Sequence, residues 1–231
     1  MSTYVITDIH GHYKEFLRML KIVNFDTKKD RIISLGDMVD RGPNPLEVIN
    51  FFYNSTYAIS LKGNHEFWLT EFYDAEKDNF ENETYYYNTP RILKKCCSEH
   101  QIEMYMEWMK GLHIQTSCYV GRRRFLLAHG ATYSDPGQHT IEDYCNPDEG
   151  WYENILSNET EQSYISIVGH LPTSSLYMYG VRDAVPGKIY HSKNGKVIFL
   201  DCGAAYPELE SSQLSCIRLE DLEEFYVRSE R

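Results

Sequence analysis

The sequence lacks any long apolar run. None of its 231 residues falls in a stretch approaching the roughly 20 consecutive apolar residues of a membrane-spanning helix. Its first residues, MSTYVITDIHGH, also lack the basic segment followed by an apolar segment that marks a secretory signal. We therefore expect a cytoplasmic protein with no membrane partner.

The cysteines lack the spacing of a zinc site. They lie at positions 96, 97, 118, 145, 202 and 216, and the missing secretory signal argues against a disulfide framework. Reduced thiols are expected, with Cys96 and Cys97 in the packed core, where free cysteine is commonly found. A chain of this length can bury a sizeable core without disulfides or a structural metal. Any bound metal would then be expected to act in catalysis and not in stabilising the fold.

Positive charge is scarce, since 34 acidic residues outnumber 23 basic ones and give a formal charge of −11. An acidic protein repels polyphosphate strands, so no nucleic-acid partner is expected. The hydrophobic content of 42% and charged content of 25% are typical of globular proteins. With no internal repeat or linker, residues 1–231 are expected to form a single domain.

Short apolar runs rich in β-branched residues repeatedly end in polar residues or glycine. Six such runs are YVIT before Asp8, RIISL before Gly36, AISLK before Gly63, FLLA before His129, SIV before Gly169 and VIFL before Asp201. These are typical of buried strands. Helical spacing lies between the early runs, so the pattern predicts an α/β fold, in which ligands bind beyond the carboxyl ends of the strands.

Three helical segments and one loop are predicted. Apolar residues at one-face spacing predict helices that include residues 13–20 and 102–109, and Pro45 suits the first turn of another. The acidic, tyrosine-rich segment 74–90 is expected to be an insertion or loop that shapes the rim of a pocket. After Gly187, short runs separated by turns predict antiparallel strands.

Side chains that bind metals follow five of the predicted strands. The clusters are Asp8-Ile9-His10-Gly11, Gly36-Asp37-Met38-Val39-Asp40-Arg41-Gly42, Gly63-Asn64-His65-Glu66, His129-Gly130 and Gly169-His170. Carboxylate, imidazole and amide groups form a mixed nitrogen and oxygen ligand set, which suits manganese, iron or zinc. One histidine at a strand end is commonly structural, but five converging clusters favour a functional site.

This pattern resembles the metallophosphoesterases of the calcineurin-like superfamily, in particular the small bacterial and phage form of the PPP-type serine/threonine phosphatases. The blocks DxH, GDxxDRG, GNHE, HG and GH occur in order, and the resemblance spans residues 4 to about 205. The tripeptide Asp40-Arg41-Gly42 narrows the resemblance to the PPP-type phosphatases within the superfamily. The resemblance implies a metallophosphoesterase-type β-sandwich of mixed sheets flanked by helices.

The resemblance also implies two divalent metal ions, with manganese expected and iron or zinc as alternatives. Asp8 and His10 would bind the first ion, and Asp37 would bridge the two. The ligands of the second ion would be Asn64, His129 and His170. Two such ions can activate a water molecule to hydroxide and neutralise phosphate oxygens during in-line attack.

The remaining motif residues would act on the substrate. His65, held by Asp40, would protonate the leaving group. Arg41 offers a planar fork for two phosphate oxygens, with Asn64 beside it at the substrate. Glu66 is expected to cap or orient its loop without touching substrate.

Three assignments stay open. His191 also ends an apolar run and competes with His170 for the last ligand position. Many relatives have a second phosphate-binding arginine between the HG and GH blocks, but residues 131–168 contain neither arginine nor lysine. The run Arg122–Arg124 is predicted to form a hairpin turn, with a substrate role as the lesser alternative. Tyr206 is a candidate for lining the phosphate pocket or for packing.

The expected function is metal-dependent hydrolysis of a phosphoester, with phosphorylated proteins (serine or threonine, and also tyrosine) placed first and small phosphoesters as the other substrate class. The alternative is symmetrical hydrolysis of dinucleoside tetraphosphates, because those hydrolases share all five blocks. The complete ligand set argues against a binding module that has lost its metals. Asp40-Arg41 and the acidic balance argue against a nuclease.

Overall fold

The computed structural model describes residues 1–76, 87–156 and 162–229, which contain two five-stranded sheets. The first sheet has the order β10-β9-β1-β2-β3, with β1 (Thr3–Ile6), β2 (Arg31–Ser34), β3 (Ala58–Ser60), β9 (Gln213–Arg218) and β10 (Glu223–Arg228). The second has the order β4-β5-β6-β8-β7, with β4 (Gln115–Val120), β5 (Arg123–Ala128), β6 (Ile165–Val168), β7 (Tyr190–His191) and β8 (Val197–Phe199).

Both sheets are mixed, as the sequence predicts. Strands β1, β2 and β3 are parallel, and so are β5, β6 and β8. The antiparallel partners are β9 and β10 in the first sheet and β4 and β7 in the second. Because the C-terminal strands β9 and β10 complete the sheet that β1 begins, we propose that the chain is one domain.

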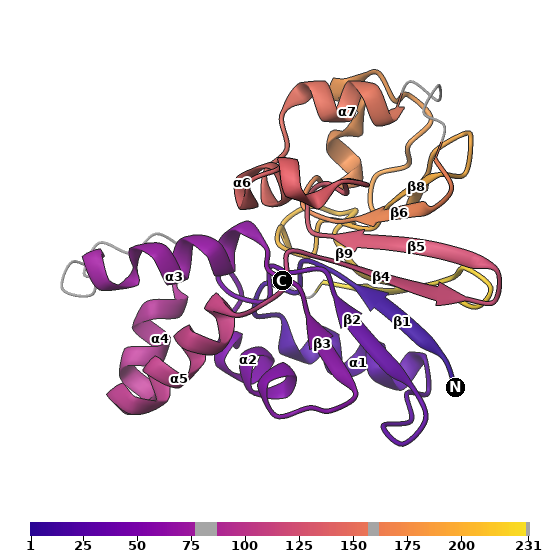
Figure 1. Ribbon diagram of the computed structural model, residues 1–231. Helices are drawn as coiled ribbons and strands as arrows, with labels where there is room; N and C mark the ends of the chain where they lie inside the picture. Colours follow the sequence, from indigo (N-terminus) through magenta and orange to yellow (C-terminus); the bar gives the residue numbers. More distant parts are fainter. Residues whose placement is uncertain (77–86, 157–161, 230–231) are drawn as a thin grey trace.

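The two sheets pack face to face and are covered by helices on their outer sides (Figure 1). Val5 and Ile33 of the first sheet share a buried cluster with Phe125 and Ile167 of the second. Tyr4, next to Val5, joins a different cluster with residues of α1 and α2. This alternation follows from the two-residue period of a strand. The expected β-sandwich of mixed sheets flanked by helices is confirmed.

The described helices are α1 (Tyr13–Ile22), α2 (Pro45–Tyr53), α3 (Asn64–Glu76), α4 (Thr89–Cys96), α5 (Glu99–Lys110), α6 (Ile141–Cys145) and α7 (Glu149–Leu156), with 3₁₀ helices η3 (Pro136–Gln138) and η4 (Thr173–Tyr179). The three predicted helices correspond to α1, α2 and α5. Pro45 occupies the first turn of α2, where its missing N–H is not needed. Ser98 and Gln101 form a capping box that starts α5. Among the described helices, none has the length and apolar character needed to cross a bilayer.

Two predictions need correction. In the predicted loop 74–90, residues 77–86 lie outside the described part of the chain, but both flanks are helical, since α3 continues to Glu76 and α4 begins at Thr89. The core prediction is wrong for Cys96, which is exposed, while Cys97 is half-buried. Leu93 fills the buried face of α4, and Cys96 lies on its last turn beside exposed lysines. All six cysteines are free thiols, as expected.

Candidate active site

The predicted site residues meet where strands from both sheets end. Asp8 and His10 follow β1, Asp37 follows β2, and Asn64 and His65 begin α3 just after β3. His129 follows β5 and His170 follows β6 in the other sheet. Six of these seven side chains are fully buried, and His170 is partly buried. The strand ends thus bring together side chains that are up to 162 residues apart.

Glycine lets the loops approach one another closely. A Cβ atom on Gly63 would stand 2.2 Å from Asp37 Oδ1, and one on Gly169 would stand 2.1 Å from Thr7 Oγ1. Real side chains do not tolerate such distances, so both positions require glycine. The glycines of the GNHE and GH blocks therefore serve loop packing, and they place neighbouring ligand groups within contact distance.

Backbone strain is concentrated at this site. Eight described non-glycine residues have a positive φ, and six of them belong to the motifs: Asp8, His10, Asp37, Asp40, Arg41 and His170. Such conformations cost on the order of 1–3 kcal/mol each and persist where surrounding contacts enforce them. The contacts include hydrogen bonds from Asp8 N to Gly36 O (3.2 Å) and from His10 N to Asp37 O (2.9 Å). The surrounding contacts thus hold strained backbone conformations that direct these side chains toward one point.

Asp37 lies at the centre of the cluster. Its Oδ1 accepts a hydrogen bond from the backbone N–H of His65 (3.0 Å), at the N-terminus of α3. Its Oδ2 lies 3.4 Å from His10 Nε2 and 3.4 Å from His129 Nε2. Burial alone would raise the pKa of Asp37, but His129 and His65 hold it well below its usual range. Asp37 is therefore ionised and shared by two groups of candidate metal ligands.

Asp8 and His10 each have one atom held by the protein and another that faces the centre. Asp8 Oδ2 accepts hydrogen bonds from Thr7 Oγ1 (2.5 Å) and His170 N (3.1 Å). His10 Nδ1 lies 2.9 Å from the carbonyl oxygen of Val39. Asp8 Oδ1 and His10 Nε2 lie 3.9 Å apart, and His10 Nε2 lies 3.4 Å from Asp37 Oδ2. Burial holds the pKa of His10 well below its usual value, so the ring is neutral, the form that binds metals.

The second group brings an amide oxygen and two imidazoles together. Asn64 Oδ1 lies 2.8 Å from His129 Nε2 and 3.0 Å from His170 Nδ1, and the two histidine nitrogens are 3.3 Å apart. Ligand bonds of about 2.0–2.1 Å separate neighbouring ligand atoms by about 3.0–3.4 Å in octahedral or tetrahedral geometry. The spacing of these atoms therefore fits a divalent ion. Burial and the neighbouring His129 lower the pKa of His170 to about 3, which keeps it neutral.

The structure does not bring His191 into this cluster. His191 lies on β7 at the edge of the second sheet, where its Nε2 is 2.8 Å from Glu224 Oε1. The geometry thus separates two histidines that end similar apolar runs. His170 is the one that faces Asn64 and His129.

His65 has a neighbour at each ring nitrogen. Its Nδ1 lies 2.8 Å from Asp40 Oδ2, while Asp40 Oδ1 accepts a hydrogen bond from Thr89 N. Its Nε2 lies 3.4 Å from Arg41 Nη2. His65 is close enough to His10 and Asp37 to join them around an ion, but the guanidinium beside Nε2 opposes a further cation there. Burial disfavours its charge, yet Asp37 and Asp40 outweigh burial and raise its pKa.

Comparison with known proteins identifies the family. A sequence model of the calcineurin-like phosphoesterases matches residues 1–200. The chain belongs to the calcineurin-like phosphoesterase family. The resemblance drawn from the motifs, and with it the expectation of a metallophosphoesterase-type hydrolase, is confirmed at the level of the family.

Curated relatives match over a shorter stretch. Symmetrical bis(5'-nucleosyl)-tetraphosphatases are 41% identical over 68 residues in Coxiella burnetii and 45% identical over 80 residues in Buchnera aphidicola. These segments cover 29% and 34% of this chain but only 23% and 29% of the relatives' own lengths. The similarity in sequence is therefore local.

Solved structures show the same fold along the whole chain. A provisionally assigned diadenosine tetraphosphatase superposes with a TM-score of 0.70 at 14% identity, covering 98% of this chain and 92% of that one. A protein serine/threonine phosphatase from Saccharomyces cerevisiae gives 0.63 at 16% identity, covering 100% and 80%. At such identities the likeness concerns the fold of the calcineurin-like phosphoesterases and not their substrates.

Arg41 and the arginines of the GRRR run lie in different parts of this phosphoesterase. Arg41 lies in the site with its guanidinium 4.9 Å from the centre of the Tyr206 ring, so Tyr206 packs against Arg41. Arg123 donates hydrogen bonds to the carbonyl oxygens of Leu219 and Glu220. Arg123 starts β5 and His129 follows its end, about 20 Å away at strand rise. The hairpin turn is Gly121-Arg122, since Val120 pairs with Arg123, and the predicted turn is wrong for Arg123 and Arg124, which lie in β5.

Glu66 connects the second and third motifs. One carboxylate oxygen accepts hydrogen bonds from Asp37 N (2.8 Å) and Gly63 N (2.9 Å), and the other from Met38 N (2.8 Å) and Val39 N (3.3 Å). The side chain is fully buried. Glu66 therefore orients both loops, in agreement with its expected role.

Replacing Glu66 with alanine is expected to lower the free energy of unfolding by at least about 3 kcal/mol, because four buried N–H groups lose their acceptor. Urea denaturation measures this change. The control is Glu71→Ala at an exposed position of the same helix, where a change within about 0.5 kcal/mol is expected. Equal effects of the two replacements would show that the Glu66 hydrogen bonds do not hold the loops.

The sequence did not predict two aromatic residues that lie beside His65. The ring of Trp68 is 5.5 Å from that of His65, and the Tyr87 ring stacks on His65 at 5.6 Å with an interplanar angle of 26°. Trp68 lies one helical turn after His65, so the spacing could have revealed it once α3 was known. Tyr87 carries no comparable signal, because it reaches His65 only through the tertiary fold.

Proposed function

We propose that this phosphoesterase uses two divalent ions to hydrolyse phosphate bonds. The observation that carries the proposal is the position of Asp37 Oδ2 between the imidazoles of His10 and His129, with both nitrogens 3.4 Å away. One ion would be held by Asp8, His10 and Asp37, and the other by Asp37, Asn64, His129 and His170. The mixed nitrogen and oxygen set favours manganese, with iron or zinc as alternatives.

Bound ions would supply positive charge for the phosphate oxygens and lower the pKa of a water molecule. The chain's own residues would complete the chemistry. Arg41 would bind two phosphate oxygens through its guanidinium, with Asn64 beside the substrate. His65 would donate a proton from Nε2 to the leaving oxygen, while Asp40 fixes the opposite nitrogen and stabilises the charged ring.

We propose dinucleoside tetraphosphates as the substrate. The support comes from the curated relatives, which are symmetrical bis(5'-nucleosyl)-tetraphosphatases. In symmetrical cleavage, water would attack one inner phosphorus and its bond to the central bridging oxygen would break. The departing nucleoside diphosphate would take the proton from His65, and the attacked half would leave as the second nucleoside diphosphate. The sequence alone placed phosphoproteins first, and the relatives favour its stated alternative.

A substrate panel tests both the proposed substrate and the proposed metal mechanism. Manganese-loaded protein is assayed against diadenosine tetraphosphate, phosphoserine, phosphothreonine and phosphotyrosine peptides, and p-nitrophenyl phosphate at matched concentrations. We expect kcat/KM for diadenosine tetraphosphate to exceed that for every peptide by about 100-fold, with activity lost after chelation and restored by manganese. The reverse ranking would overturn the substrate, and full turnover after chelation would overturn the metal mechanism.

His170→Ala is expected to raise the manganese concentration needed for half-maximal activity by about 10-fold or more, because the second ion loses a ligand. His191→Ala is the matched control, since that ring bonds only Glu224 among the contacts described. The control is expected to bind manganese like the unmodified protein. Metal titration with elemental analysis of bound manganese measures both. The opposite order would assign the ligand role to His191.

A further inference from the structure

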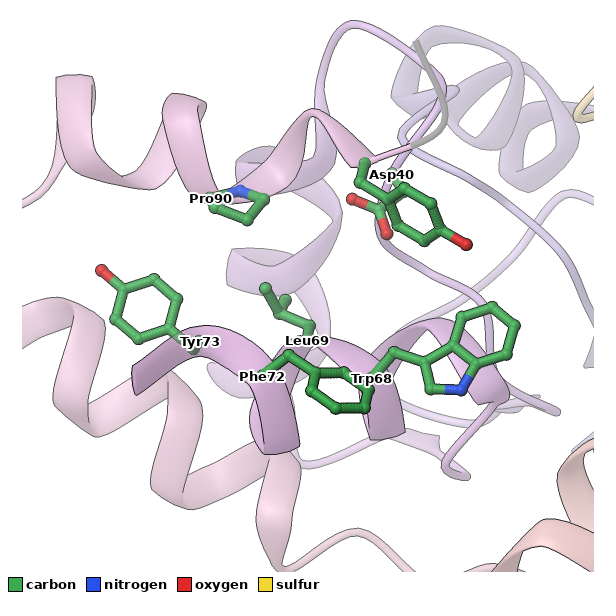
Figure 2. Close-up of a pocket in the computed structure, with 7 residues that line it drawn as sticks. Asp40, Trp68, Leu69, Phe72, Tyr73 and Pro90 are labelled. Carbon is green, nitrogen blue, oxygen red and sulfur yellow. The ribbon is translucent and has the colours of Figure 1, made fainter. Parts of the chain in front are cut away.

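An aromatic cavity opens beside His65. It has a volume of about 300 Å³ and is lined by Asp40, Trp68, Leu69, Phe72, Tyr73, Tyr87 and Pro90. Figure 2 shows Trp68, Leu69, Phe72 and Tyr73 projecting from α3, with Pro90 and Asp40 opposite them. No step of the hydrolysis described above uses these aromatic side chains.

The cavity adjoins His65, the proposed proton donor. Asp40 lines it and also holds Nδ1 of His65. The rings of Trp68 and Tyr87 both contact the ring of His65, and they lie 6.2 Å from each other. A group attached to the leaving oxygen at His65 would therefore enter this cavity.

The lining suits a flat and uncharged group. Among the described lining residues only Asp40 carries a charge, and both of its carboxylate oxygens already bind His65 and Thr89. Phe72 is 53% exposed and Tyr87 is 46% exposed, so both offer ring surface to a ligand. Stacking on aromatic side chains is the general mode by which proteins bind nucleobases.

The position of the cavity along α3 indicates what lies between the reacting phosphorus and the ring. Its lining residues on α3 run from Trp68 to Tyr73, about 4.5 to 12 Å beyond His65 along the helix. An aryl group esterified directly to phosphorus would fill only the end next to His65. A nucleotide places its ribose and remaining phosphate before the base, and so reaches farther along α3.

We propose that this cavity binds the nucleobase of the leaving nucleotide. The proposal rests on the dinucleoside tetraphosphate function stated above. Arg41 then binds the reacting phosphate, while Trp68 and Phe72 stack on the base at the far end of the leaving nucleotide. The ring contacts contribute affinity for the nucleotide, whereas His65 and Arg41 act on the reacting phosphate.

The test uses Phe72→Ala, whose exposed position makes it compatible with folding, and Trp68→Leu as a second variant. For each manganese-loaded protein, calorimetry measures the Kd of ADP and of inorganic pyrophosphate, and kinetics gives KM and kcat for diadenosine tetraphosphate and for a phosphotyrosine peptide. We expect the Kd of ADP and the KM to rise about 10- to 100-fold, while the Kd of pyrophosphate changes less than about twofold. Tyr119→Ala, an exposed aromatic residue on β4, is the control and should match the unmodified protein.

The outcomes separate this inference from the proposed function. Parallel weakening of ADP and pyrophosphate, or no weakening of either, would overturn the nucleobase site even if diadenosine tetraphosphate is hydrolysed. Loss confined to phosphotyrosine peptides would assign the cavity to an aryl group and overturn the proposal. If the unmodified protein fails to hydrolyse diadenosine tetraphosphate, the proposed function fails, and selective loss of ADP binding would still support the base site.

Discussion

Replacing Asp37 with asparagine is expected to lower kcat by about 10³-fold or more. Bound divalent ions contribute several kcal/mol of transition-state stabilisation, and each 1.4 kcal/mol corresponds to a factor of ten. In the proposed centre Asp37 is the carboxylate shared by both ions, so losing its charge is expected to weaken the binding of both. Elemental analysis should find fewer than two manganese ions per chain.

Asparagine suits this position structurally. Asp37 has φ of 52°, and asparagine is among the few non-glycine residues that adopt this left-handed conformation readily. Its side-chain oxygen can still accept the hydrogen bond from His65 N. The variant should therefore fold, and Asp183→Asn on the surface is the control that should keep both metal and activity. If Asp37→Asn retained two manganese ions and an unchanged kcat, Asp37 would not be a metal ligand.

Replacing His65 with asparagine is expected to lower kcat by about 10²–10⁴-fold while two manganese ions remain bound. The reason is that His65 Nδ1 binds Asp40 and Nε2 faces Arg41, so the ring is placed to donate a proton and not to hold an ion. His100→Asn, on the exposed surface of α5, serves as the control. Loss of metal from His65→Asn would instead support His65 as a ligand alongside His10 and Asp37.

The defect in His65→Asn should also depend on the leaving group. The more basic phenolate leaving group needs the proton more, whereas p-nitrophenolate departs readily without it, so the loss of kcat should be smaller for the activated ester. Rates for phenyl phosphate and p-nitrophenyl phosphate measure this difference. Equal losses on both substrates would mean that His65 positions the phosphate and does not act as the acid.

The sequence by itself determined the mixed α/β fold and the convergence of the five motifs. Apolar runs and helical spacing are local signals, and parallel strands place their carboxyl ends at one edge, so Asp8, Asp37 and Asn64 had to meet. The role of Glu66 was also readable, because an acidic residue three positions after Gly63 can reach back to the start of α3.

The Gly169-His170 motif favours His170 over His191 as a ligand, but only the tertiary structure shows which ring lies beside Asn64 and His129. Both end apolar runs, but β6 lies inside the second sheet and β7 at its edge, and strand order is set by packing between distant segments. The same holds for the link from Glu66 to the Asp37 loop and for the ring of Tyr87 on His65. These contacts depend on how the two sheets and α3 pack, and no local pattern in the sequence encodes that arrangement.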